Sequence, residues 1–66
     1  MEGTINVTVG GKLYTGRCQV THEGYVVVSY GVDLKRAPLA GANVDQLAPA
    51  LLRELIGEVL ERKARP

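Results

Sequence analysis

Apolar residues in the last third of the chain recur at helical spacing. Between residues 45 and 63 they lie at positions i, i+3, i+4, i+7 and i+8, the repeat that places side chains on one face of an α-helix. The members of this repeat are Leu47, Ala48, Leu51, Leu52, Leu55, Ile56, Val59 and Leu60. The pattern therefore predicts an amphipathic helix over residues 45–63, around which the rest of the chain is organised.

The apolar arc of this helix is wider than packing on one surface requires. At about 100° per residue the apolar positions spread over about 220°, whereas a helix on a single sheet needs an arc of only a little over about 100°. We therefore expect a second surface, most simply another copy of the chain, to cover part of the arc. Long loops folded over the end of the arc are the alternative. The candidate self-association residues are Val27, Leu52, Ile56, Val59 and Leu60.

The two ends of the predicted helix carry typical signals. Asn43 or Asp45 can cap the first N–H groups, and basic residues follow the last apolar position. Pro49 disfavours a regular helix at its position, because it lacks an N–H and crowds the carbonyl four residues before it. Two outcomes stay open: the regular helix starts near Pro49, or a separate turn precedes it with a kink.

The N-terminal half alternates between apolar and polar residues, as in half-buried strands. Residues 4–9 form the first such stretch, and the Gly-Gly pair at residues 10–11 is a two-residue hairpin signal. This turn pairs Val9 with Lys12 and begins a second strand over residues 12–21. The inward side of that strand then consists of Tyr14, Gly16, Cys18 and Val20.

A three-residue loop at residues 22–24 leads into a third strand over residues 25–30. With Gly24 as the last loop residue, Val20 lies opposite Val26, and the apolar residues of the third strand face inward. Residues 34–39 are a candidate fourth strand, which a proline within it would restrict to a sheet edge.

These elements predict an α+β fold: an antiparallel meander of three to four strands with one C-terminal amphipathic helix packed on one face. The chain of 66 residues is expected to form a single small domain over residues 1–66. A domain of this size buries only about 60% of its unfolded surface, which again favours oligomerisation.

Composition excludes several classes of function. Eight Lys and Arg against seven Asp and Glu give a net charge of +1, so charge alone does not indicate nucleic acid or an anionic membrane as a partner. No apolar run approaches the roughly 20 residues that span a bilayer, and no leader pattern is visible. One cysteine rules out an internal disulfide, and with one histidine it cannot build a usual zinc site. We expect a cytoplasmic location, no membrane, no metal and no cofactor.

The residues with catalytic potential are better explained by structure than by chemistry. The predicted register places Cys18 inside, as a small buried hydrophobe, and His22 in an exposed turn. The carboxylates Glu54, Glu58 and Glu61 fall on the polar face of the helix, and a solvated face explains them better than paired acid–base groups. No catalytic residue set is present, so the sequence predicts a protein that is not an enzyme.

The outward face of the predicted sheet is the most informative surface. It is expected to combine Arg17 and Tyr25 with Lys35 and Arg36 near the edge. Such residues can bind single-stranded nucleic acid by ionic contacts and stacking. A plain solvated face, or one packed in a dimer, is the other interpretation.

Two motifs resemble those of a group of short uncharacterised bacterial proteins. They are Gly11-Lys12-x-Tyr14-x-Gly16 and Leu51-Leu52-Arg53-Glu54-Leu55, joined by a valine-rich strand. The resemblance covers most of the chain. It implies a meander with a C-terminal helix and a bacterial origin, and it implies no activity or site residue.

The sequence disfavours an enzyme site assembled between subunits from Cys18, His22 or tyrosine residues, and three other functional hypotheses follow. The first is a non-enzymatic, homodimeric interaction module that self-associates through the helix arc and the third strand. The second is a nucleic-acid-binding or regulatory accessory protein that uses the outer sheet face. The third is a small inhibitor or adaptor that docks on a larger protein.

Overall fold

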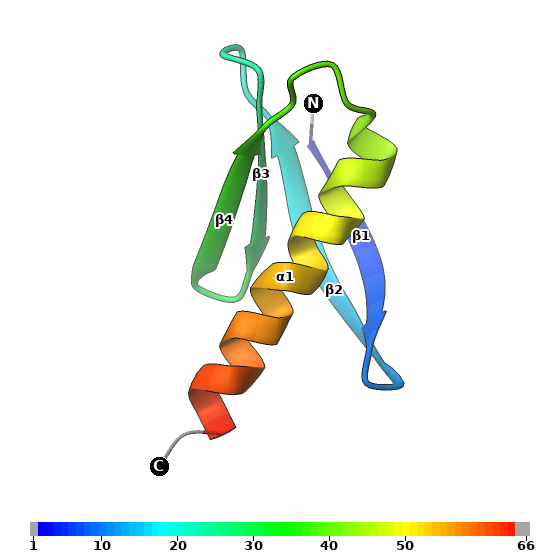
Figure 1. Cartoon of the computed structure of the whole chain (residues 1–66), viewed down its shortest axis with the longest axis vertical. Coiled ribbons are helices and arrows are strands. Elements are labelled where there is room, and N and C mark those ends of the chain that lie inside the picture. Colours follow the sequence, from blue (N-terminus) through cyan, green and yellow to red (C-terminus); the bar gives the residue numbers. More distant parts are fainter. Residues whose placement is uncertain (1, 65–66) are drawn as a thin grey trace.

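The computed structural model describes residues 2–64, which form a four-stranded antiparallel sheet with one helix across one face (Figure 1). The elements are β1 (Glu2–Val9), β2 (Lys12–Val20), β3 (Tyr25–Tyr30), β4 (Asp33–Pro38) and α1 (Val44–Ala64). The strand order is β1-β2-β3-β4, so a hairpin joins each strand to the next. The predicted α+β meander is confirmed, and the fourth strand forms.

The first hairpin has the predicted register because its turn requires two glycines. Gly10 and Gly11 have φ angles of 59° and 79°, the left-handed values that a type I′ turn needs at both central positions. Val9 pairs with Lys12, and Val7 with Tyr14, as the sequence predicts.

The second hairpin also follows its predicted loop. Val20 lies opposite Val26, and the Thr21 N–H donates to the Tyr25 carbonyl at 2.9 Å, which closes a three-residue loop. Gly24, the last loop residue, has a φ of 86°, which a side chain would oppose.

The register of the third hairpin determines which side chains of β4 point toward the helix. Its two-residue turn is Gly31-Val32, and Gly31 has a φ of 64°, as at the first central position of a type II′ turn. The resulting register places Lys35 opposite Val28, which is fully buried. Lys35 therefore lies on the face that carries the helix.

Asn43 caps the helix. Its side-chain Oδ1 accepts a hydrogen bond from the Asp45 N–H at 2.8 Å, and its carbonyl accepts one from the Leu47 N–H at 2.9 Å. One helix then runs from Val44 to Ala64 with Pro49 inside it. Pro49 therefore does not mark the helix start.

The wide apolar arc of α1 is covered by the chain's own sheet. Leu52 and Ile56 are fully buried and Val59 is 5% exposed in the single chain, so these side chains pack on the chain's own sheet, and a self-association surface that includes them stays a prediction. The physical reason is that α1 packs on β1, β3 and β4, and a twisted sheet curves around more of a helix than a flat surface would. Of the predicted arc residues, Leu60 stays the most open, at 38% exposure.

A glycine on β2 lets the helix come this close. An added Cβ at Gly16 would lie 2.7 Å from a Leu52 methyl carbon and 2.7 Å from the Ser29 carbonyl oxygen. Real Cβ atoms do not approach other atoms at this distance, and the carbonyl belongs to the backbone of β3. Gly16 is therefore needed where Leu52 presses on the sheet.

Candidate interaction surface on the outer face of the sheet

The face of the sheet opposite α1 is open to solvent. Strand alternation and the three registers place there Thr4, Asn6, Thr8, Leu13, Thr15, Arg17, Gln19, Tyr25, Val27, Ser29, Leu34, Arg36 and Pro38. Leu13 and Leu34 are 65% and 69% exposed, high values for large apolar side chains. This set of side chains is called the outer face below.

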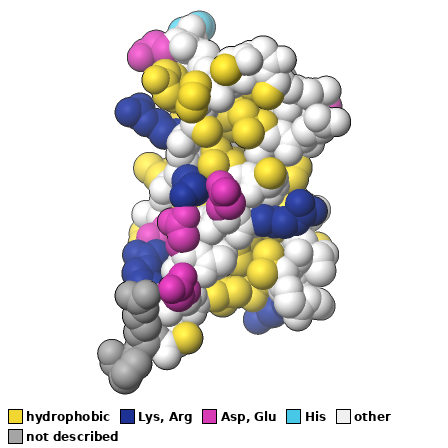
Figure 2. Space-filling model, in the orientation of Figure 1, with side chains coloured by type: hydrophobic (Ala, Val, Ile, Leu, Met, Phe, Trp, Pro, Cys, Tyr) yellow, Lys and Arg dark blue, Asp and Glu magenta, His cyan; other side chains and the backbone are white. Residues whose placement is uncertain are grey.

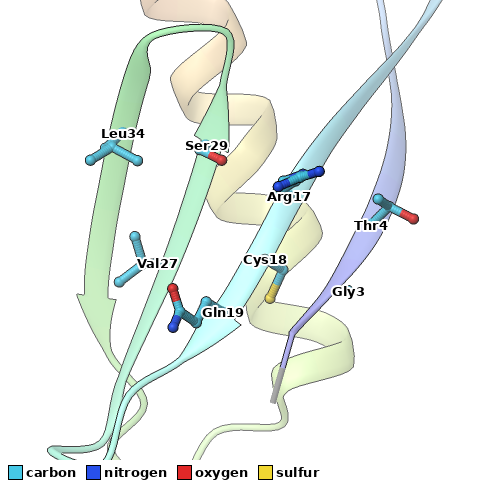
Figure 3. A pocket seen from close by; sticks show the side chains of 8 residues that line it. All are labelled: Gly3, Thr4, Arg17, Cys18, Gln19, Val27, Ser29 and Leu34. Atoms are coloured by element: carbon cyan, nitrogen blue, oxygen red, sulfur yellow. The ribbon is translucent and has the colours of Figure 1, made fainter.

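One row of the outer face crosses all four strands. Thr4 pairs with Arg17, Arg17 with Ser29, and Ser29 with Leu34. Gln19 and Val27 belong to the next row. Together these residues line a shallow hollow of about 580 Å³, with Arg17 near its centre and the two aliphatic side chains toward β4 (Figure 3).

The charge of this hollow comes from Arg17. Among the described side chains none forms an ion pair with Arg17, and none of those that point outward from the strands is a carboxylate. Arg36 lies farther along β4, with its guanidinium carbon 5.1 Å from the centre of the Tyr25 ring, in cation–π contact. Over the side chains described for residues 3–64, the outer face is therefore positively charged with an apolar border.

Lys35 does not belong to the outer face. Its Nζ contacts the Glu58 carboxylate on α1, and this hydrogen bond raises the pKa of the Lys35 ammonium above its ordinary value. The second link between α1 and β4 joins Arg62 to Asp33 at 2.8 Å. Figure 2 shows this helix side, where carboxylates and basic side chains alternate over the surface. Of the residues that the sequence predicts on the outer face, Arg17, Tyr25 and Arg36 therefore lie there and Lys35 does not.

The outer face also carries residues that the sequence analysis did not select. These residues are Leu34 and Pro38, which point outward beside Arg36. Val27, a candidate self-association residue, is half-buried between Gln19 and Arg36. The turn Gly31-Val32 contains the signal for this placement, because a glycine at the first position of a two-residue turn sets the register of the next strand.

The residues with catalytic potential lie apart from one another. Cys18 points toward α1 and is 9% exposed, and its burial raises the pKa of the thiol. His22 is exposed in the turn between β2 and β3. Within the part of the chain that the structure describes, no three His, Cys, Asp or Glu side chains are grouped as a metal site requires.

Two further observations concern the chain as a whole. Over residues 2–64 no helix has both the length and the hydropathy needed to span a bilayer. Comparison with protein-family models, with curated proteins and with solved structures finds no match.

Proposed function

We propose that this protein is a non-enzymatic, homodimeric interaction module whose outer face binds an extended, acidic and partly apolar segment of a partner protein. The observation that carries the proposal is the Arg17 guanidinium, which lies in a hollow with no described carboxylate to neutralise it. The buried lone cysteine is in keeping with a cytoplasmic setting.

The chemistry of the hollow favours such a segment. A guanidinium forms two parallel hydrogen bonds with a carboxylate, and these charge-assisted bonds are among the strongest in proteins. Val27 and Leu34 beside Arg17 would cover an aliphatic side chain of the ligand, and Gln19 and Ser29 can hydrogen-bond to its backbone. A module of this kind acts as an adaptor or inhibitor when the acidic segment belongs to a larger protein.

Single-stranded nucleic acid is the competing ligand class. It needs several stacking platforms, and the outer face offers Tyr25, whose ring is already in contact with Arg36. The protein ligand is favoured because the aliphatic border of the hollow has no role in phosphate binding.

The test is an NMR titration of isotope-labelled protein. The ligands are an eight-residue peptide of alternating Glu and Val, the same peptide with Lys in place of Glu, and a single-stranded oligonucleotide at low salt. We expect the Glu peptide to shift signals of Arg17, Val27 and Leu34, and Arg17→Gln to weaken its binding by about five- to tenfold. Arg53→Gln is the matched control, because Arg53 is an exposed arginine on α1.

Each other result counts against the proposal. Equal changes in the NMR signals with the Lys peptide would show that charge does not contribute to peptide binding. Shifts with the oligonucleotide alone would assign the outer face to nucleic acid, and equal effects of the Arg17 and Arg53 variants would remove the hollow as the binding site.

A further inference from the structure

The two edge strands of the sheet are protected to different degrees. β4 ends at Pro38 and carries the charged residues Asp33, Lys35 and Arg36, features that oppose the addition of another strand. β1 is eight residues long, and residues 3–9 contain neither a proline nor a charged side chain. Over residues 3–9 the edge of β1 is therefore a neutral and unprotected template.

The backbone of β1 has groups that can pair with another strand. In a two-residue hairpin the residues flanking the turn exchange both backbone hydrogen bonds, and hydrogen-bonded and free pairs then alternate along the ladder. Starting from the pair Val9 and Lys12, this alternation leaves the N–H and C=O groups of Thr4, Asn6 and Thr8 directed away from β2. No backbone hydrogen bond to these groups is found among residues 2–64.

We propose that two copies of the chain pair antiparallel through β1, about a two-fold axis at Asn6, so that their sheets join into one of eight strands. This inference rests on the proposed self-association and assigns it a surface. An axis at Asn6 uses the free backbone groups of Thr4, Asn6 and Thr8, because Asn6 then pairs with its own copy and Thr4 pairs with Thr8 of the partner subunit.

The side chains of residues 3–9 are self-complementary in this register. On the outer face, threonine meets threonine and asparagine meets asparagine, so the paired residues are polar and no like charges oppose each other. On the inner face, Ile5 meets Val7 of the partner subunit. Ile5 is half-buried in the single chain, and the added strand would cover it.

The start of the helix provides space for the end of the added strand. A hollow of about 230 Å³ lies between β1 and α1, lined mostly by small and apolar residues that include Ile5, Cys18 and Ala48, and also by Thr4 and Asp45. In Figure 1 the first turns of α1 extend past β1 at this end of the strand. The proposed register brings Val9 of the partner subunit opposite Gly3, where an added Cβ would meet nothing within 4 Å, so an aliphatic side chain can enter the hollow.

Two variants of Asn6 test the pairing. Asn6→Pro removes the central outward N–H but keeps the ladder to β2, because Asn6 lies at a free position of that ladder. Asn6→Lys places two positive charges opposite each other at the two-fold axis, and its solvent-directed side chain leaves the fold intact. Thr15→Lys is the matched control: it adds the same charge and removes the same Thr15–Asn6 side-chain hydrogen bond of 2.6 Å, one strand away from the edge.

The measurements are the concentration dependence of the mass by sedimentation, and NMR of a mixture of labelled and unlabelled protein. We expect the wild type to dimerise, both Asn6 variants to raise the dissociation constant at least about tenfold, and Thr15→Lys to change it less than about twofold. The mixed sample should show an intermolecular contact between the Hα protons of Ile5 and Val7, because free pairs of an antiparallel ladder bring these atoms close.

The outcomes separate this inference from the proposed function. A dimer that persists in both Asn6 variants and lacks the Ile5–Val7 contact would overturn the β1 interface alone. A wild type that stays monomeric up to about 1 mM, where any affinity would correspond to less than about 4 kcal/mol, would overturn self-association altogether.

Discussion

The two faces of the sheet differ in what they leave accessible. The inner face is closed: Val26, Val28 and Leu52 are fully buried, and Gly16 allows direct contact between the strand and the helix. The outer face presents Arg17 and large aliphatic side chains to solvent. The position of an apolar residue in the helical repeat therefore does not show whether its side chain is accessible. Leu52 and Ile56 on the helix are buried, whereas Leu13 and Leu34 on the outer face are exposed.

The same leucine-to-alanine substitution should have very different costs on the two faces. Leu52→Ala removes a fully buried side chain, and we expect it to lower the free energy of unfolding by about 3 kcal/mol. Leu34→Ala removes one that is 69% exposed and should cost less than about 0.5 kcal/mol. Urea denaturation followed by circular dichroism measures both. Equal costs would mean that the outer face is covered.

Gly16 provides the next largest effect. Gly16→Ala forces either the Ser29 carbonyl or Leu52 to move, and we expect a loss of about 2 kcal/mol in the free energy of unfolding. Gly3→Ala is the control, because its Cβ would meet nothing within 4 Å, and it should stay within about 0.5 kcal/mol of the wild type. Urea denaturation again measures both variants. A Gly16→Ala variant with an unchanged free energy of unfolding would contradict the close packing of Leu52 on the sheet.

Cys18 should make the stability of the fold depend on pH. Burial raises the pKa of its thiol, so the folded state favours the neutral form. The corresponding stability is fully present below the pKa of the unfolded thiol and is lost as the pH rises through the folded value. Between about pH 8 and pH 10 the wild type should therefore lose more stability than Cys18→Ala. Identical pH profiles would exclude a buried thiol.

The smallest expected effect lies on the polar side of α1. Gly57 is exposed and an added Cβ has open space, so Gly57→Ala should raise the free energy of unfolding by up to about 1 kcal/mol through helix propensity. Ala50→Gly, at an exposed position of the same helix, should lower it by a similar amount. Thermal denaturation of the pair measures the difference, and a destabilised Gly57→Ala would mean that this side of α1 is covered.

Most of the fold could be predicted from the sequence, because the residues of each turn fix the register of the two strands that it joins. The glycines at positions 10, 11 and 24 determined which side chains face inward on the first three strands. The side of β4 depended on the turn at Gly31, and without that register Lys35 was assigned to the outer face although it contacts Glu58. The burial of Leu52 and Ile56 could not be predicted from the spacing of apolar residues along the helix, because the curvature of the sheet that covers them depends on all four strands together.

The protected edge of β4 has a further consequence for the size of any assembly. Two-fold pairing through β1 would use both open edges and leave only the two β4 edges, each ending at Pro38 and carrying charged residues. A third chain would find no strand to extend. In such a pairing growth would stop at two subunits, and the proline and charged residues of β4 would keep a protein with an exposed β1 edge from forming fibres.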